Sequence, residues 1–306
     1  MAKRSSAGTN FWIIFLVIVF VLVLTILAGF VFYTQFKGEK ARNESLTFDI
    51  PEKNKDLNAE TENRIRELEN KLKALDTAGS PLTQDQISAV VELWCPDDNY
   101  DTNGFLSMGS GTIISNKGII FTNRHVVSNE DWSVIKSSPT CYVGITEDIS
   151  QPSKFKYVAD ILAYSPQTPD FFDFDVAVLY IYDVCKECPD AASSLPKVFP
   201  YLETGQSAVM GPGDYVSIIG YPEIGASTWN FTDGIISGRV GDFVLKTDAK
   251  IDSGNSGGAA LDSKNQLIGI PTWTISGQAE TIGYIIGIDM VYEWFEEKVL
   301  PFIENS

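Results

Sequence analysis

The sequence predicts a large all-β domain that follows two helical segments. From residue 82 onward, short runs rich in Val, Ile, Tyr and Phe alternate with turns of Gly, Asn, Asp, Ser and Pro. This alternation is typical of a β-sandwich or β-barrel. Residues 11–33 contain no charged side chain, and residues 57–77 carry apolar side chains at helical spacing. The 306 residues leave room for one large domain or two smaller ones beside these segments.

The charge of the chain bears on its partners. The net charge is -17 and the sequence pI is near 4.4. A protein that binds nucleic acid needs a basic surface to neutralise phosphates, so no nucleic-acid partner is expected. The 44% of hydrophobic residues is enough to build a buried core.

Four cysteines bear on the compartment, and they are Cys95, Cys141, Cys185 and Cys188. An even number fits two disulfides in an oxidising compartment, and the spacing alone allows three pairings. A zinc site is the alternative, but the second C-x-x-C pair or the His ligands that it usually needs are missing. We therefore expect no metal and no cofactor.

The N-terminal region predicts a membrane anchor. After a polar tail of residues 1–10, the 23 residues 11–33 would span about 34 Å as a helix, which exceeds a hydrocarbon core of about 30 Å. Trp12 and Tyr33 lie at its two ends, where interfacial aromatic residues are favoured. A cleaved signal peptide is the alternative, but the apolar run is long and no clear A-x-A site follows it. Lys and Arg flank both sides, so charge alone does not set the orientation.

A polar linker, residues 34–56, leads to a predicted coiled-coil helix at 57–77. The apolar residues that would form its seam have 3-4-3 spacing, and they are Ile65, Leu68, Leu72 and Leu75. Acidic residues precede basic ones by four positions along this segment, which supports a helix. The segment either pairs with other copies of the chain or serves as a solvated spacer helix.

The apolar runs of the β region predict its strands, and a helix is predicted at the end of the chain. The helix is expected to begin near Asp289, which could cap it, and to end before Pro301. The predicted strands include Gly111–Ser115, Gly118–Thr122, Cys141–Thr146, Val176–Tyr182, Tyr215–Gly220, Gly234–Ser237 and Gln266–Pro271.

Three motifs in the β region carry residues for acyl transfer. Thr122–Val127 contains the chain's one histidine, His125, directly after a strand. Asp175 opens a second strand, and Ser256 lies in the glycine-rich turn Ile251–Gly258. Serine hydrolysis requires a base to take the hydroxyl proton and an acid to orient that base. Taken alone, each motif also fits a surface turn or a structural histidine.

Further motifs around these residues match one protein family in order. They are Gly109–Ile114 before the histidine, Gly213–Pro222, and Asp233–Ser237. The region 84–290 resembles the chymotrypsin-fold serine proteases, and most closely the HtrA/Deg branch. The resemblance implies two six-stranded antiparallel β-barrels at about 84–190 and 200–288. A C-terminal helix at 289–300 would complete a protease domain at 82–306.

The resemblance also implies roles for the residues of the three motifs. Ser256 would attack the peptide carbonyl, His125 would act as general base and then general acid, and Asp175 would orient His125. The N–H groups of Gly254 and Ser256 would form the oxyanion hole. Asp170 and Asp173 are alternatives for the acid, and the D-V-A-V-L match selects Asp175.

Substrate recognition departs from the family pattern in two ways. Members of this branch usually carry a PDZ domain after the protease, and only a short segment follows Asp289 here. Lys250 lies six residues before Ser256, where trypsin-like enzymes place the residue at the base of the S1 pocket. Lys250 would then favour an acidic P1 side chain or point to solvent. Substrate backbone is expected to pair with the strand around Thr272, Trp273 and Thr274.

The implied barrel topology also assigns the cysteines. Cys95 would end the first strand and Cys141 would begin the fourth, and these strands are neighbours in a closed barrel. We therefore expect a Cys95–Cys141 disulfide. Cys185 and Cys188 would pair with each other or stay as a redox-sensitive C-x-x-C.

Together these expectations describe a membrane-anchored serine endopeptidase that lies outside the cytoplasm and cleaves misfolded or exposed protein segments. Its partners would be protein or peptide substrates, the lipid membrane through residues 11–33, and other copies of the chain, with a trimer favoured by the family resemblance. The alternative is a protease-fold scaffold or chaperone-like binder with little turnover.

Overall fold

The computed structural model describes residues 19–35, 37, 61–66, 81–97, 106–129, 131–167, 174–223, 228–276 and 281–301. The chain divides into two compact units, Met1–Asn70 and Lys71–Ser306.

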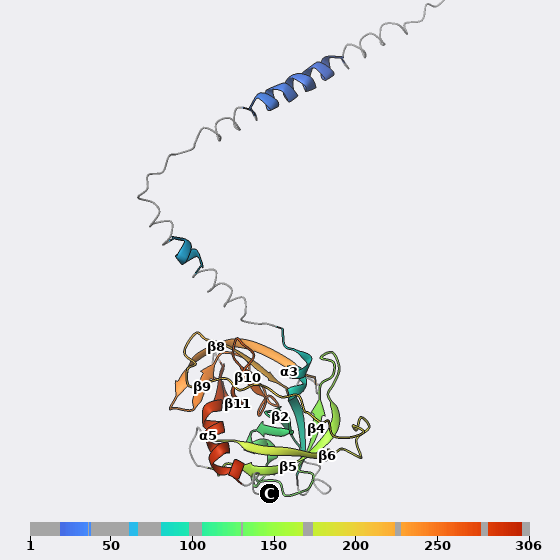
Figure 1. Cartoon of the computed structure of the whole chain (residues 1–306), viewed down its shortest axis with the longest axis vertical. Coiled ribbons are helices and arrows are strands. Elements are labelled where there is room, and N and C mark those ends of the chain that lie inside the picture. Colours follow the sequence, from blue (N-terminus) through green and yellow to red (C-terminus); the bar gives the residue numbers. More distant parts are fainter. Residues whose placement is uncertain are drawn as a thin grey trace, which may run out of the picture. The chain divides into compact units, whose positions relative to one another are not determined.

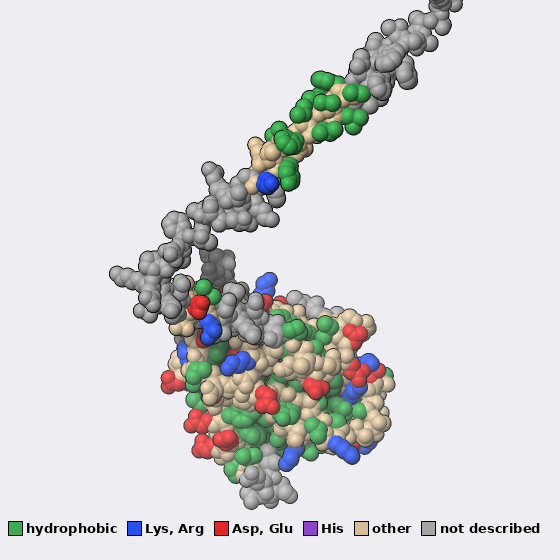
Figure 2. All heavy atoms as spheres, turned by 45° about the horizontal axis from the view of Figure 1, so that its top comes forward, with side chains coloured by type: hydrophobic (Ala, Val, Ile, Leu, Met, Phe, Trp, Pro, Cys, Tyr) green, Lys and Arg blue, Asp and Glu red, His purple; other side chains and the backbone are tan. Residues whose placement is uncertain are grey.

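The first unit contains two described helical segments. Residues 19–35 are helical and expose apolar side chains along their length (Figure 2). Residues 61–66 are also helical, and the rest of the predicted coiled coil at 57–77 lies outside the described residues. None of the helices in the described part of the chain has the length and apolar character needed to span a membrane. The predicted span at 11–33 begins outside the described residues.

The second unit contains two closed antiparallel β-barrels with the same strand order (Figure 1). The first runs β1-β2-β3-β6-β5-β4 and the second β7-β8-β9-β12-β11-β10. The strands of the first barrel are β1 (Val90–Pro96), β2 (Leu106–Ile113), β3 (Ile119–Thr122), β4 (Cys141–Ile145), β5 (Lys154–Tyr164) and β6 (Ala177–Val184). Those of the second are β7 (Tyr215–Gly220), β8 (Asn230–Val240), β9 (Val244–Thr247), β10 (Ala259–Leu261), β11 (Leu267–Ser276) and β12 (Thr281–Gly287). The predicted pair of six-stranded barrels is confirmed.

Three apolar clusters among the described residues stabilise this unit. One fills the first barrel around Leu93 and Leu179, and a second fills the other barrel around Ile218 and Leu245. The third cluster contains Phe121 of β3 together with buried residues of the second barrel and the C-terminal helix. Burial of apolar area on this scale is the main stabilising term. The third cluster fixes the two barrels against each other, which a site shared between them requires.

Two of the described α-helices, α3 and α5, pack beside the barrels. The short helix α3 (Gln84–Ala89) begins with a capping box, in which Thr83 and Gln86 satisfy each other's backbone N–H groups. The helix α5 (Ile288–Lys298) buries Phe295, whose ring meets that of Phe121 edge to face at 5.4 Å. This helix confirms the predicted C-terminal one.

The predicted capping role of Asp289 is wrong, because the N-cap residue is Gly287. Asp289 lies in the first turn and accepts hydrogen bonds from Ser207 Oγ at 2.9 Å and Ala208 N at 2.6 Å. A carboxylate in the first turn is still favourable for the helix dipole. Its partners come from far along the chain, so the local pattern did not reveal them.

Both disulfides lie in the first barrel. Cys95 is bonded to Cys141 and links β1 to β4, which are antiparallel neighbours. Cys185 is bonded to Cys188 just after β6. These are the two pairings named from the sequence. Among the described residues, no group of His, Cys, Asp or Glu is arranged to hold a metal ion.

Candidate active site

His125 lies in a short 3-10 turn, η2 (Arg124–Val127), directly after β3. Val126 and Val127 of this turn are buried in the core of the first barrel. Their burial fixes the turn, while the imidazole of His125 stays 31% exposed. A partly exposed imidazole on a rigid turn can exchange protons with a bound molecule.

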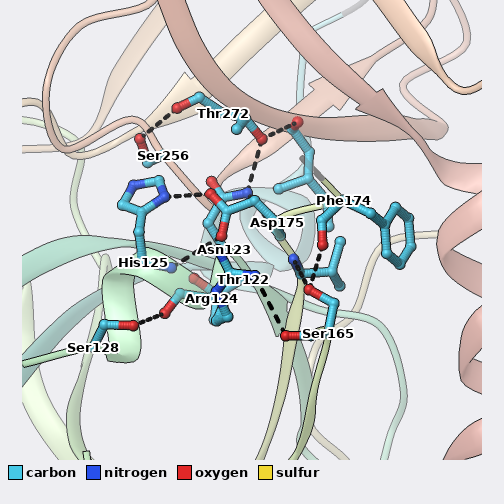
Figure 3. Close-up of polar contacts among 12 residues, drawn as sticks. Thr122, Asn123, Arg124, His125, Ser128, Ser165, Phe174, Asp175, Ser256 and Thr272 are labelled. Atoms are coloured by element: carbon cyan, nitrogen blue, oxygen red, sulfur yellow. Dashed lines mark hydrogen bonds and ion pairs between the residues drawn. The ribbon is translucent and has the colours of Figure 1, made fainter. Parts of the chain in front are cut away.

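Asp175 meets His125 because β3 and β6 are paired, with Thr122 opposite Ala177. One carboxylate oxygen accepts the backbone N–H of His125 at 3.0 Å, and the other lies 2.5 Å from Nδ1 (Figure 3). Burial of the carboxyl raises the pKa of Asp175, but the hydrogen bonds and charge of His125 outweigh it, so the pKa is lowered. An ionised carboxylate on Nδ1 favours the tautomer that leaves Nε2 free as a base.

Ser256 lies in the turn between β9 and β10, and two glycines shape that turn. Gly254 has φ +94° and Gly257 has φ +84°, a region that side chains disfavour. A Cβ at Gly254 would lie 2.3 Å from the Tyr221 carbonyl oxygen, and one at Gly257 would lie 2.2 Å from the Ser110 carbonyl oxygen. Only glycine fits at either position, so the conformation of the turn requires both Gly254 and Gly257.

The hydroxyl of Ser256 donates a hydrogen bond to the backbone carbonyl of Thr272 at 3.0 Å (Figure 3). Among the described residues, this is the one hydrogen bond of that hydroxyl, and none joins it to His125. Within the same part of the chain, the N–H groups of Gly254 and Ser256 donate to no protein acceptor. Two free N–H donors beside a serine hydroxyl are the elements of an oxyanion hole.

The carbonyl of Thr272 points at Ser256 because β11 is irregular there. The register between β11 and β12 shifts between Pro271 and Trp273, so Thr272 has no partner opposite it. Such a bulge redirects the backbone of one residue. Thr272 is nevertheless buried, which makes its orientation well defined.

Asn123 connects Asp175 to β11, and its importance was not predicted from the sequence. Its side chain is fully buried, and its Nδ2 donates to the Asp175 carbonyl at 2.7 Å and to Thr272 Oγ1 at 2.8 Å (Figure 3). It therefore ties the first barrel to the second beside the histidine turn. Its place two residues before His125 was the only signal in the sequence.

The predicted substrate-binding residues lie near the strands of the second barrel, at different depths. Lys250 is exposed, and its backbone carbonyl accepts a hydrogen bond from Thr232 Oγ1 at 2.7 Å. Trp273 is half-buried and stacks on Tyr284 with ring centroids 5.8 Å apart. Thr274 is exposed on the same strand. Asp170 and Asp173, the alternative acids, lie outside the described residues.

Comparison with known proteins identifies the family of the chain. The family model described as "Trypsin-like peptidase domain" matches residues 109–270. The chain belongs to the trypsin-like peptidase family. By that membership it is classed with the serine endopeptidases.

Several relatives are periplasmic proteases by name. The chain is 31% identical to the periplasmic serine endoprotease DegP of Salmonella typhimurium over 219 residues, which cover 67% of this chain and 39% of that protein. It is 31% identical to DegP of Escherichia coli over 189 residues, which cover 58% of this chain and 32% of that protein. A probable DegP-like protease of Brucella suis is 28% identical, with 60% of this chain and 31% of that protein covered. The chain thus spans less than half the length of these relatives.

Proposed function

We propose that this trypsin-like peptidase hydrolyses peptide bonds in proteins with Ser256 as nucleophile, His125 as acid–base and Asp175 as the group that orients it. One observation carries the proposal. The Asp175 carboxylate holds both the backbone N–H and Nδ1 of His125, beside a glycine-shaped turn that presents Ser256.

The reaction follows from this arrangement. A substrate segment pairs with β11 near Thr272, and the Ser256 hydroxyl turns from the Thr272 carbonyl to Nε2 of His125. Ser256 Oγ then bonds to the scissile carbonyl carbon while its proton moves to Nε2. The N–H groups of Gly254 and Ser256 stabilise the negative carbonyl oxygen of the tetrahedral intermediate.

Collapse of the intermediate completes the cycle. Nε2 gives its proton to the leaving nitrogen as the C–N bond breaks, which leaves an acyl group on Ser256. Water then attacks the ester while His125 again takes a proton, and Nε2 returns this proton to Ser256 Oγ as the bond to the acyl carbon breaks and the carboxylic acid leaves. Asp175 stays ionised throughout and stabilises the imidazolium.

The substrates proposed are misfolded or exposed segments of proteins outside the cytoplasm. The relatives are named as periplasmic proteases, and two disulfides suit an oxidising compartment. The uncharged run at 11–33 remains the basis for proposing a membrane anchor. Extraction of membranes at alkaline pH tests it, since release of the full-length chain into the soluble fraction would contradict anchoring.

A protease-fold scaffold with little turnover is the second candidate. It is favoured by one observation, namely that the Ser256 hydroxyl is bonded to Thr272 and not to His125. A scaffold would bind unfolded protein but would not acylate Ser256.

The deciding experiment treats the full-length chain with a fluorophosphonate probe and with unfolded casein. The wild type is expected to be labelled and to cleave casein, and Ser256→Ala to do neither. Ser253→Ala is the matched control, because Ser253 lies in the same turn and its side chain is exposed. It should behave as wild type. Casein binding by a folded wild type without labelling or cleavage would reject the protease and favour the scaffold.

A further inference from the structure

Ser110 lies on β2 of the first barrel, yet two of its hydrogen bonds reach the Ser256 turn of the second barrel. Its backbone N–H donates to the Ser256 carbonyl at 2.8 Å. Its hydroxyl donates to the Gly254 carbonyl at 2.6 Å. The residue has no exposed surface, so water does not compete for either bond.

These two bonds bracket an N–H group of the oxyanion hole. The Gly254 carbonyl belongs to the peptide plane before Asn255, and the Ser256 carbonyl belongs to the plane after Ser256. The Ser256 N–H lies in the plane between them. Because Ser110 holds the planes on both sides, it restricts the rotation of the one in the middle. The preceding plane is held separately, since the Ser253 carbonyl accepts the Glu223 N–H at 2.9 Å.

Ser110 also accepts two hydrogen bonds, which fix its own position. Its hydroxyl oxygen accepts the Tyr221 N–H at 2.9 Å, which directs the hydroxyl hydrogen at Gly254. Its carbonyl accepts the Thr122 hydroxyl at 2.7 Å. Thr122 is the last residue of β3, three positions before His125. A chain of hydrogen bonds therefore runs from the histidine turn through Ser110 to the nucleophile turn.

We propose that Ser110 is a positioning residue, which fixes the Ser256 N–H of the oxyanion hole from the first barrel. The proposal rests on the proposed function, since it concerns the same site. Ser110 touches no reacting atom. Its effect on the reaction passes through the turn, and displacement of a reacting group by about 1 Å is enough to cost about 10²-fold in rate.

A purely structural role is the competing explanation. Removal of the Ser110 hydroxyl would leave the buried Gly254 carbonyl and Tyr221 N–H without partners, and that destabilises the fold. Loss of stability alone would lower the amount of folded enzyme and leave the turnover of each folded molecule unchanged. The two explanations are separated by kinetics normalised to folded protein.

The experiment compares Ser110→Ala with Thr112→Val in the full-length chain. Thr112 lies on the same strand, is equally buried, and its hydroxyl has no partner among the described residues. Thr112→Val thus removes a buried hydroxyl from β2 without touching the turn. The measurements are kcat and KM on a fluorogenic peptide, the affinity for a peptide boronic acid with the same P1 side chain, and thermal unfolding.

For Ser110→Ala, kcat is expected to fall about 10- to 100-fold with KM within about twofold. The boronate, which places an oxyanion in the hole, should lose affinity by the same factor. Thr112→Val should retain the wild-type values, and Ser110→Thr, which keeps the hydroxyl, should recover much of kcat. If Ser110→Ala does not fold, Thr122→Val removes only the bond to the Ser110 carbonyl, and a smaller loss with the same selectivity is expected.

Unchanged kcat and boronate affinity in folded Ser110→Ala, or in Thr122→Val where it replaces that variant, would overturn the proposal even if the melting temperature drops. A rise confined to KM would also overturn it, since the hole acts on the transition state. These outcomes leave the proposed function intact as long as wild-type turnover depends on Ser256. Absence of Ser256-dependent turnover in the wild type would reject both.

Discussion

The turns that follow the third strand of each barrel are equivalent in topology but position different chemistry. In the first barrel this turn follows β3 and presents the side chain of His125. In the second it follows β9 and presents Ser256 together with two N–H groups that have no acceptor in the described part of the chain. The first turn is anchored by buried Val126 and Val127, whereas the second depends on glycines with positive φ.

The comparison shows that a side chain and a backbone group need different support. Packing of neighbouring side chains is enough to hold an imidazole, because its rotamer is then set by one partner, Asp175. Backbone N–H groups can be aimed only by setting φ and ψ, which requires glycine and hydrogen bonds on the adjoining carbonyls. The first barrel supplies such bonds through Ser110. The first barrel also carries both disulfides. The barrel that donates hydrogen bonds to the Ser256 turn is therefore the one that disulfides stabilise.

Removing the partner of the imidazole should have the largest effect. In Asp175→Asn, the amide keeps the size of the side chain but stabilises the wrong tautomer of His125, so kcat should fall about 10⁴-fold. The measurement is kcat on a fluorogenic peptide, with circular dichroism to verify the fold. Asp183→Asn is the control, because Asp183 lies on β6, the strand that follows Asp175, and its carboxylate contacts surface Lys186 and the backbone N–H of Val184. A loss below tenfold for Asp175→Asn would mean that packing alone orients the imidazole.

The same contrast explains what could be predicted from the sequence. The strands, the histidine turn and the glycine turn were found because each is encoded by adjacent residues. The contacts of Ser110 with Gly254 and of Asn123 with Thr272 join residues 144 and 149 positions apart, and no local pattern encodes them. The resting contact of Ser256 with Thr272 also depends on a bulge in β11 that the apolar run Gln266–Pro271 did not indicate.

Element boundaries differed from expectation for a related reason. The predicted strand Gly234–Ser237 is part of β8 (Asn230–Val240), whose side chains alternate between half-buried and exposed positions over most of its length. The strand was predicted too short because one of its faces is exposed to solvent and carries polar residues, which interrupt the apolar pattern. Asp289 was expected to cap α5, but its carboxylate instead accepts hydrogen bonds from Ser207 and Ala208.

The two disulfides offer a second way to examine the bracing of the first barrel. Cys95 and Cys141 are 46 positions apart, and Cys185 and Cys188 are 3 apart. Loop closure predicts a loss of about 4 kcal/mol for the Cys95→Ala, Cys141→Ala double variant and about 2 kcal/mol for Cys185→Ala, Cys188→Ala. Urea unfolding measures both losses, and each double variant serves as the control for the other. Equal losses would show that native packing around the sulfurs, and not the length of the closed loop, sets the stabilisation.

The smallest effect is expected on the surface of the same barrel, where Glu147 pairs with Lys154 at 2.8 Å and with Lys156. Hydrogen bonds from these lysines lower the pKa of Glu147 from 4.5 to about 2. The depressed pKa means that the stabilisation is complete above pH 4.5 and is lost as the pH falls toward 2. Because Glu147 is 46% exposed, Glu147→Gln should cost only about 0.2–1 kcal/mol at pH 7. Urea unfolding at pH 7 and pH 3, each at low and high salt, should show this difference shrinking with acid and with salt. A loss above 2 kcal/mol that salt does not reduce would instead place this ion pair among the interactions that brace the barrel.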